Sequence, residues 1–266
     1  MTHLTASVQG IGVLGPALSD WPHMCSVLRG EAPFRPVTTV LPPPAILPPA
    51  ERRRAGRTIK LALAIGAEAV AHAQADANLL PTVFTSAGGD GENCHEICSA
   101  LASSDRQISP TRFHNSVHNA AAGYWTIAYG CTEPSTSLCA NDASFGAGLV
   151  EAASQLASGQ PSVLLIAYDV DYPAPLGKCR PIPDAFGVAL VLTASPSQRS
   201  LARITLQLCD SEPSVVADPQ LEQLRRTIPA ARSVPLLECI ARQGSATVVL
   251  DYLAGTCIAV AVSPHA

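Results

Sequence analysis

The stretch from residue 119 to residue 168 reads NAAAGYWTIAYGCTEPSTSLCANDASFGAGLVEAASQLASGQPSVLLIAY, and it alternates between helical and extended patterns. Small residues dominate 119–129 and predict a helix, and 135–138 predicts a short strand. Residues 143–158 predict a long helix that stops at a glycine, and the apolar run 163–167 predicts a buried strand. Alternation of this kind indicates a layered α/β fold.

The same alternation extends outward in both directions. Residues 32–50 contain seven prolines, which exclude helix or sheet and predict a surface excursion. The further elements that we expect are strands at 5–14, 82–86, 188–193, 204–208, 247–250 and 257–262, and helices at 51–78, 92–102, 221–227 and 235–242.

Composition excludes several classes of protein. Of 266 residues, 47% are hydrophobic and 14% charged, so a sizeable core can form. The net charge of -4 gives no basic footprint for nucleic acid or an anionic membrane. The one basic run, Arg52–Arg54 with Arg57 and Lys60, is interpreted as the solvated first turn of a helix. No stretch reaches the roughly 18 apolar residues of a membrane helix, and residues 1–15 do not predict a secretory signal.

The cysteines suggest the compartment. Nine are scattered along the chain, an odd number without a framework spacing. We therefore expect reduced, mostly buried thiols in a cytoplasmic protein.

The order and spacing of several short motifs resemble β-ketoacyl synthases of the thiolase superfamily. Asn119–Gly123 resembles the family's N-x-A-A-G segment, and Ser135–Leu138 stands where the family has S-T-A-C. Gly159-Gln160 precedes an apolar strand as in the family, and Asp184–Ala189 stands in the place of its G-E-G-A-A strand. The resemblance covers roughly residues 5–210, and it implies a thiolase-like fold truncated to the N-terminal half of a ketosynthase.

The resemblance also implies how the chain is organised. Residues 1–195 would form the ketosynthase-like domain, and residues 196–266 a reduced C-terminal segment packed on it. The segments 113–119 (FHNSVHN) and 135–145 (STSLCANDASF) are similar to short chain length factors of aryl polyene systems, which are type II fatty acid or polyketide-like. That subgroup implies a non-catalytic subunit without a cofactor. It would pair with a full-length ketosynthase, meet the acyl carrier protein through that complex, and form a homodimer when alone.

A condensing enzyme needs a cysteine at the start of a buried helix, where the helix dipole and backbone amides stabilise a thiolate. Counting back from Gly159-Gln160 at the family's spacing places this position at Asp142. A carboxylate cannot carry the acyl group as a thioester. The only histidine beyond it is His265, so this chain does not supply the family's catalytic histidines. We expect no catalytic residue, and we expect Asp142 to cap the helix by accepting hydrogen bonds from first-turn amides.

Two alternatives remain at this stage, an acyltransferase or thioesterase and a zinc-stabilised scaffold. A shifted register would make Cys139 a nucleophile, with His114 or His118 as its base, in an acyltransferase or thioesterase; the favoured interpretation of Cys139 is a buried thiol at a strand end. His114 and His118 share one face if the following helix extends back to them. Cys94, Cys98, His114 and His118 also fit the spacing of a zinc site in a zinc-stabilised scaffold, although we expect no metal.

Side chains near the subunit boundary are the candidates for shaping an acyl tunnel. A closed apolar tunnel would stop growth when the next two-carbon unit overpacks its end. The tunnel or interface candidates are Phe113, His114, His118, Asn119, Trp125, Leu138 and Phe145.

Overall fold

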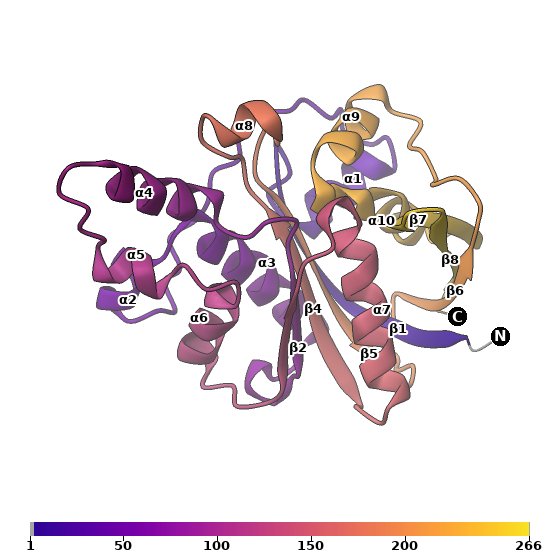
Figure 1. Ribbon diagram of the computed structural model, residues 1–266. Coiled ribbons are helices and arrows are strands. Elements are labelled where there is room, and N and C mark those ends of the chain that lie inside the picture. Colours follow the sequence, from indigo (N-terminus) through magenta and orange to yellow (C-terminus); the bar gives the residue numbers. More distant parts are fainter. Residues whose placement is uncertain (1–2, 266) are drawn as a thin grey trace.

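The computed structural model describes residues 3–265, and this part of the chain forms one eight-stranded sheet with helices on both faces (Figure 1). The strand order is β3-β2-β4-β5-β1-β6-β8-β7. β2 is parallel to both β3 and β4, and the other neighbours are antiparallel. The strands are β1 (Leu4–Leu14), β2 (Thr82–Thr85), β3 (Ser135–Leu138), β4 (Ser162–Asp169), β5 (Phe186–Thr193), β6 (Ala202–Cys209), β7 (Ala246–Leu253) and β8 (Thr256–Pro264).

Two apolar cores lie on the two faces of this sheet. The α-helices are α1 (Trp21–Leu28), α2 (Pro49–Arg54), α3 (Arg57–Ala73), α4 (Gly91–Ala102), α5 (Pro110–His114), α6 (Ala120–Tyr129), α7 (Ser144–Ala157), α8 (Leu176–Cys179), α9 (Pro219–Thr227) and α10 (Val234–Ala241). Helices α3 and α6 cover one face, and α1, α7 and α10 cover the other. Val163 and Leu165 of β4 enter the α7 core, and Leu164 and Ile166 enter the α3 core. Burial on both faces explains why β4 is apolar throughout.

The predicted strands are all present, with shifts of a few residues at their ends. The single helix predicted over 51–78 is wrong. It breaks at Ala55-Gly56 into α2 and α3, and it ends at Ala73 because Gln74 adopts a left-handed conformation with φ of 52°. A short 3-10 turn, η1 (Ala77–Leu79), follows.

Three short helices were not predicted. α1 begins at Trp21 and is capped by Asp20, whose carboxylate accepts a hydrogen bond from the His23 amide at 2.8 Å. α5 and α8 have only 5 and 4 residues, too few for a hydrophobic period to show. The proline-rich stretch has no helix or strand until α2 begins at Pro49, as predicted.

The C-terminal segment continues the sheet. β6 pairs with β1, and β8 and β7 extend the sheet beyond β6. Residues on both sides of position 195 therefore share one sheet, and the division at that position stays a prediction. None of the helices between residues 3 and 265 has the length and apolarity needed to cross a bilayer.

The prediction of mostly buried thiols is wrong. All nine cysteines are free, but only Cys25 and Cys131 are buried. The exposed cysteines are Cys94, Cys98, Cys139 and Cys179, and the half-buried ones are Cys209, Cys239 and Cys257. Their positions on outer helix faces and at strand ends leave them uncovered, which composition alone does not reveal.

Candidate functional site

The junction between β3 and α7 holds Asp142, the residue that sequence spacing predicts to stand where the family has its nucleophile. Residues Asn141–Ala143 form a 3-10 turn, η2, that leads directly into α7. The Ser144 hydroxyl donates to the Asn141 carbonyl oxygen at 2.7 Å and accepts from the Ala140 amide at 3.1 Å. The Thr85 hydroxyl at the end of β2 donates to the Ser144 carbonyl oxygen at 2.8 Å. These hydroxyl bonds fix the start of the helix against the sheet.

Asp142 lies in this turn, and its side chain points to two arginines. Its carboxylate forms ion pairs with Arg180, just after α8, and with Arg232 at 3.3 Å, in the 3-10 turn η3 (Pro229–Ser233). No side-chain cap is present at η2 or α7, so the predicted capping role of Asp142 is wrong. Charge-assisted bonds to guanidinium groups are stronger than bonds to neutral amides, and they hold the carboxylate away from the helix.

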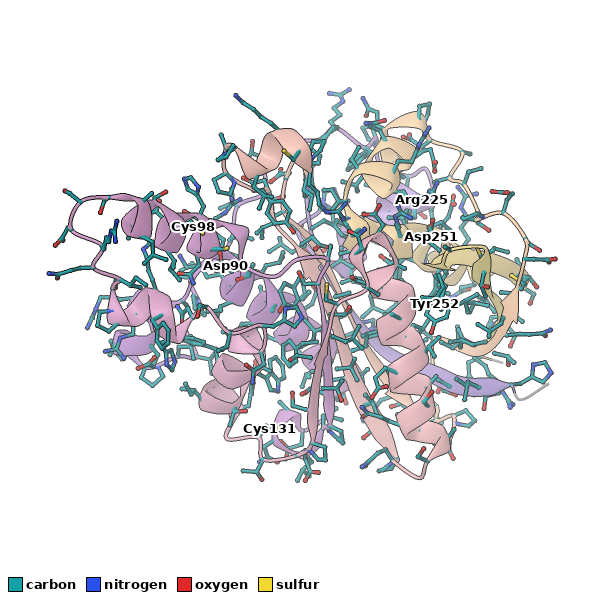
Figure 2. All side chains as sticks on the ribbon, in the orientation of Figure 1. Asp90, Cys98, Cys131, Arg225, Asp251 and Tyr252 are labelled. Atoms are coloured by element: carbon teal, nitrogen blue, oxygen red, sulfur yellow. The ribbon has the colours of Figure 1, made fainter. Side chains whose placement is uncertain are left out.

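The ion pairs continue from Asp142 into the C-terminal segment. Arg232 also pairs with Asp251 of β7, and Arg225 of α9 lies 3.5 Å from Asp251 (Figure 2). Arg225 binds both carboxylate oxygens of Glu222, each at 2.7 Å, and this bond lowers the pKa of Glu222. Three acids and three arginines alternate along this chain of contacts, so their formal charges cancel.

Close backbone packing brings α7 to β7 beside these ion pairs. A Cβ atom added at Gly146 would lie 2.4 Å from the Asp251 carbonyl oxygen. A side chain there would force the helix away from the strand. The glycine therefore permits the separation at which Arg232 contacts both Asp142 and Asp251.

Asp169 is a fully buried carboxyl group at the end of β4, close to the same junction. It accepts hydrogen bonds from the Ala87 amide at 2.8 Å, the Ala230 amide at 2.9 Å and the Ser86 hydroxyl at 3.3 Å. Burial raises its pKa to about 7, although these three donors act in the opposite direction. Asp169 thereby connects the turn after β2 to η3, which carries Arg232.

Cys139 is exposed, so the expected buried thiol is wrong. β3 lies at the edge of the sheet, and the end of an edge strand has no neighbour to cover it. The thiol donates to the Ala87 carbonyl oxygen at 3.1 Å. This recorded partner is a backbone carbonyl and not an imidazole that would act as a base.

His114 and His118 do not lie on one helix as the four-residue spacing suggested. α5 ends at His114, and His118 lies in the turn before α6 begins at Ala120. Both are exposed, and the His114 ring contacts Tyr124 edge-on with centroids 6.4 Å apart. In the region from residue 3 to residue 265, no three or more His, Cys, Asp or Glu residues are grouped as a metal site requires. The set Cys94, Cys98, His114 and His118 therefore gains no support from the structure.

The seven tunnel or interface candidates fall into two groups. Phe113 and His114 are exposed at the end of α5, His118 and Asn119 are exposed in the turn before α6, and Leu138 is half-buried on β3. Trp125 and Phe145 are each 1% exposed and lie in the two different cores, on opposite faces of the sheet. Trp125 packs against Phe84 and Tyr129. Lining of a tunnel by any of the seven stays a prediction.

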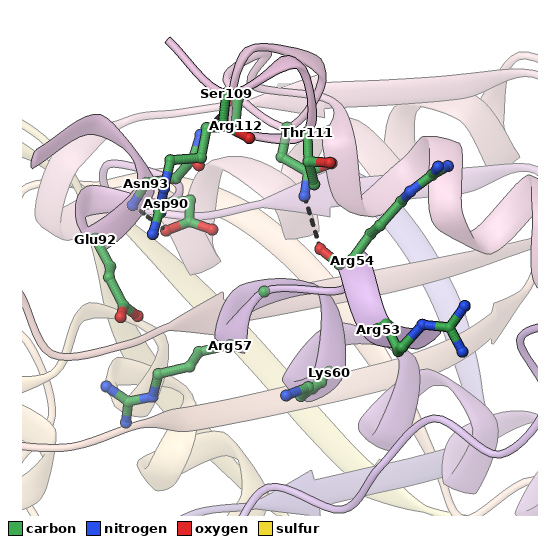
Figure 3. Close-up of a pocket in the computed structure, with 12 residues that line it drawn as sticks. Arg53, Arg54, Arg57, Lys60, Asp90, Glu92, Asn93, Ser109, Thr111 and Arg112 are labelled. Carbon is green, nitrogen blue, oxygen red and sulfur yellow. Dashed lines mark hydrogen bonds between the residues drawn. The ribbon is translucent and has the colours of Figure 1, made fainter. Parts of the chain in front are cut away.

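A cationic cavity that the sequence did not predict lies between α2–α3 and α4–α5. It has a volume of about 410 Å³, and Figure 3 shows arginine, lysine and acidic side chains around it. Three of its arginines are already paired, Arg54 with Glu51 at 2.9 Å, Arg57 with Asp171 at 2.6 Å, and Arg112 with Glu96 at 3.3 Å. The sequence feature that could have indicated this cavity is the basic run Arg52–Arg54 with Arg57 and Lys60, which on sequence grounds is interpreted as a solvated helix turn.

Comparison with solved structures reveals the same fold in polyketide-type systems. A chain of the ketosynthase (ApeO) in complex with its chain length factor (ApeC) from Xenorhabdus doucetiae matches with a TM-score of 0.75 and 22% identity, over 97% of this chain and 99% of that one. A chain of the ishigamide ketosynthase/chain length factor matches with a TM-score of 0.75 and 14% identity, over 98% of this chain and 100% of that one. A chain of AntDE:AntF, a type II PKS acyl-carrier protein in complex with its ketosynthase bound to the hexaketide, matches with a TM-score of 0.77 and 11% identity, over 99% of this chain and 100% of that one. These matches confirm the predicted truncated thiolase-like fold.

The family model gives the assignment at the level of sequence. No curated protein sequence matches the chain significantly. The family model described as "Beta-ketoacyl synthase, N-terminal domain" matches residues 29–249, and so spans most of the chain and crosses from the first helices into β7. The chain belongs to the family of β-ketoacyl synthase N-terminal domains.

Proposed function

We propose that this chain is a chain length factor, a non-catalytic subunit that pairs with an active β-ketoacyl synthase and shapes the tunnel holding the growing acyl chain. The product would be an aryl polyene or a related fatty acid or polyketide chain, as the resemblance implied. The complex would work in the cytoplasm, and the acyl carrier protein would reach it through the ketosynthase.

The state of Asp142 is the observation that carries this proposal. The position matched to the family nucleophile holds a carboxylate, and two arginines bind it. Acyl transfer needs a thiolate free to attack a thioester, and a carboxylate neutralised by ion pairs is a poor nucleophile. The ion pairs of Asp142 therefore support a structural role for this residue, at a position where active relatives would carry the nucleophile.

The exposed segment from α5 to α6 supports the pairing with a partner. Phe113, Val117 and Ile127 are 69%, 53% and 45% exposed, an unusual density of apolar side chains on one short segment. The neighbouring strand β3 ends the sheet and is only partly covered. Obligate interfaces are rich in apolar side chains, and these exposed side chains beside the open sheet edge fit that composition.

The exposure of Cys139 supports one alternative, an acyltransferase or thioesterase that uses this thiol. Acylation of the isolated chain distinguishes this alternative from a chain length factor. An acyltransferase would form a covalent thioester with an acyl donor in the absence of any partner.

The test measures both binding to the ketosynthase and acylation of the chain. The purified chain is mixed with its cognate ketosynthase, and complex formation is measured by light scattering together with condensation rate and product length. We expect a heterodimer, no acylation of the isolated chain, and full activity with Cys139→Ala. Loss of turnover with Cys139→Ala in an assembled complex, or failure to bind the ketosynthase at micromolar concentration, would overturn the proposal.

A further inference from the structure

Two cysteines face each other across neighbouring strands at the end of the C-terminal part of the sheet. Cys209 is the last residue of β6, and Cys257 is its direct partner on the antiparallel strand β8. Both are half-buried, so both thiols are partly reachable from solvent. Neither thiol takes part in the ion pairs around Asp142, although Cys257 is the register partner of Asp251 on β7.

Strand periodicity places both thiols on the same face. Leu206 and Val260 are register partners that point into the core, and Ile204 and Val262 do the same. Successive residues of a strand alternate between faces. Cys209 and Cys257 therefore both lie on the outer face, directly opposite each other.

The distances typical of such a pair suit a disulfide bond. Directly opposite residues of antiparallel strands have Cα atoms about 4.5–5.5 Å apart, within the range of about 4.4–6.8 Å that disulfides use. Cβ atoms about 4.5–5.5 Å apart need to approach by only about 1 Å. The pair ends its ladder, where the strands have most freedom to make this adjustment.

We propose that Cys209 and Cys257 form a reversible cross-strand disulfide that staples β6 to β8 when the protein meets a disulfide oxidant such as oxidised glutathione. One cysteine thiolate attacks a sulfur of the glutathione disulfide and expels one glutathione thiolate, which leaves a mixed disulfide. The second cysteine thiolate attacks the protein sulfur of that mixed disulfide and expels the second glutathione. Two protein thiols lose two protons and two electrons, and one glutathione disulfide becomes two glutathione molecules.

The surroundings of the two cysteines affect the rate of this thiol–disulfide exchange. Burial, together with the nearby Cys209, Asp251 and Glu212, raises the pKa of the Cys257 thiol, although a backbone hydrogen bond at Tyr252 opposes the shift. A smaller thiolate fraction at neutral pH slows the exchange. The site therefore responds to sustained oxidation and does not act as a fast catalytic thiol.

A second exposed pair serves as an internal comparison. Cys94 and Cys98 lie one turn apart on α4 and are more exposed than Cys209 and Cys257. Their Cβ atoms, about 5–6 Å apart on a rigid helix, are too distant for an unstrained disulfide. Accessibility alone would favour Cys94 and Cys98, whereas geometry favours Cys209 and Cys257.

The experiment equilibrates the reduced, purified full chain in a glutathione redox buffer. Free thiols are counted after denaturation, and linked peptides are identified without reduction. We expect the parent to lose two thiols, to yield a peptide joining Cys209 to Cys257, and to melt at a temperature higher by about 5 °C or more until a dithiol reductant is added. Cys209→Ser and Cys257→Ser should lose this bridge and the shift, and the double variant Cys94→Ser, Cys98→Ser should keep both.

Several results would overturn the proposal. They are retention of all thiols, a bridge at Cys94 and Cys98 or between two molecules, or glutathione adducts on Cys209 and Cys257 that do not close. A bridged protein without a rise in melting temperature would overturn the stapling. The site lies far along the sheet from β3, so these results are independent of the proposed ketosynthase partner.

Discussion

Asp142, which the family's spacing predicts to stand at the position of the nucleophile, forms ion pairs in this structure. Its carboxylate connects Arg180, near α8, with Arg232 in η3, so three distant segments meet at η2, just before α7. The side chain is 44% exposed, and such partly solvated pairs stabilise a protein modestly. Its contribution is therefore to local order at the junction more than to the total stability.

Replacement of Asp142 tests whether its ion pairs order the junction. Asp142→Ala should lower the free energy of unfolding by about 1 kcal/mol, because two arginines lose a partner, while the product length of the ketosynthase complex stays the same. Asp142→Asn should be milder, since an amide oxygen still accepts a hydrogen bond. Chemical denaturation and product analysis measure both effects, with exposed Asp105→Ala as the neutral control. Unchanged stability with an altered product length would mean that Asp142 faces the acyl chain.

The buried Asp169 predicts a dependence of stability on pH. Its pKa rises from 3.8 to about 7 on folding, so between these values the folded chain holds a proton that the unfolded chain has released. Stability should therefore fall as pH rises from about 4 to about 7 and level off above that. Asp169→Asn should flatten this part of the profile, by a slope of at most about 1.4 kcal/mol per pH unit. Parallel profiles for parent and variant in denaturant titrations would contradict this.

At the scale of elements, the contact between α7 and β7 determines how the C-terminal segment meets the rest of the chain. Gly146 permits that contact, and the Asp251 carbonyl oxygen occupies the space that a side chain would need. The same strand carries the Asp251 carboxylate that pairs with Arg232 and Arg225. Helix packing and the ion pairs therefore depend on each other.

A methyl group at position 146 tests this dependence. Gly146→Ala should lower the free energy of unfolding by about 1–3 kcal/mol, because overpacking forces α7 away from β7. Gly123→Ala is the matched control, since nothing lies within 4 Å of a Cβ added there on α6. That control should be neutral or more stable by up to about 1 kcal/mol, from helix propensity alone. Equal effects of the two substitutions in denaturant unfolding would contradict the packing argument.

The sequence predicted the elements whose signal is local and missed those that depend on distant neighbours. The apolar run of β4 and the small residues of α6 carry their own periodicity, so both were found. The break at Ala55-Gly56 was missed because the flanking residues are good helix formers. The arginines that bind Asp142 lie in later segments, and no spacing rule connects positions 142, 180 and 232. The exposure of Cys139 follows from the place of β3 in the sheet order, which is a tertiary property.

At the scale of the molecule, the two edges of the sheet differ. One edge is β3, flanked by the exposed apolar segment of α5–α6, and the other is β7, which belongs to the C-terminal segment. The proposed partner would bind the first edge. The cationic cavity opens between α2–α3 and α4–α5, and three of its arginines, Arg54, Arg57 and Arg112, already form ion pairs within the chain.

Substitutions near the two sheet edges test which edge binds the ketosynthase. Ile127→Asp and Phe113→Asp should leave the melting temperature of the isolated chain within about 2 °C, because both side chains are exposed, and weaken ketosynthase binding by about tenfold or more. Leu253→Asp on β7 is the matched control, 59% exposed and distant from β3, and it should bind as the parent does. Titration of the labelled ketosynthase with each variant measures the affinity. Parent-like binding by both α5–α6 variants would place the interface elsewhere.

The open edge at β3 also has a consequence for the living cell. Its four residues expose backbone N–H and C=O groups on one side, and such a row is a template for unintended strand pairing. A copy synthesised in excess of its partner would offer this template to other chains, to chaperones and to proteases. Balanced synthesis of the two subunits would protect it, and the amount of the ketosynthase would then set how long each newly made copy survives.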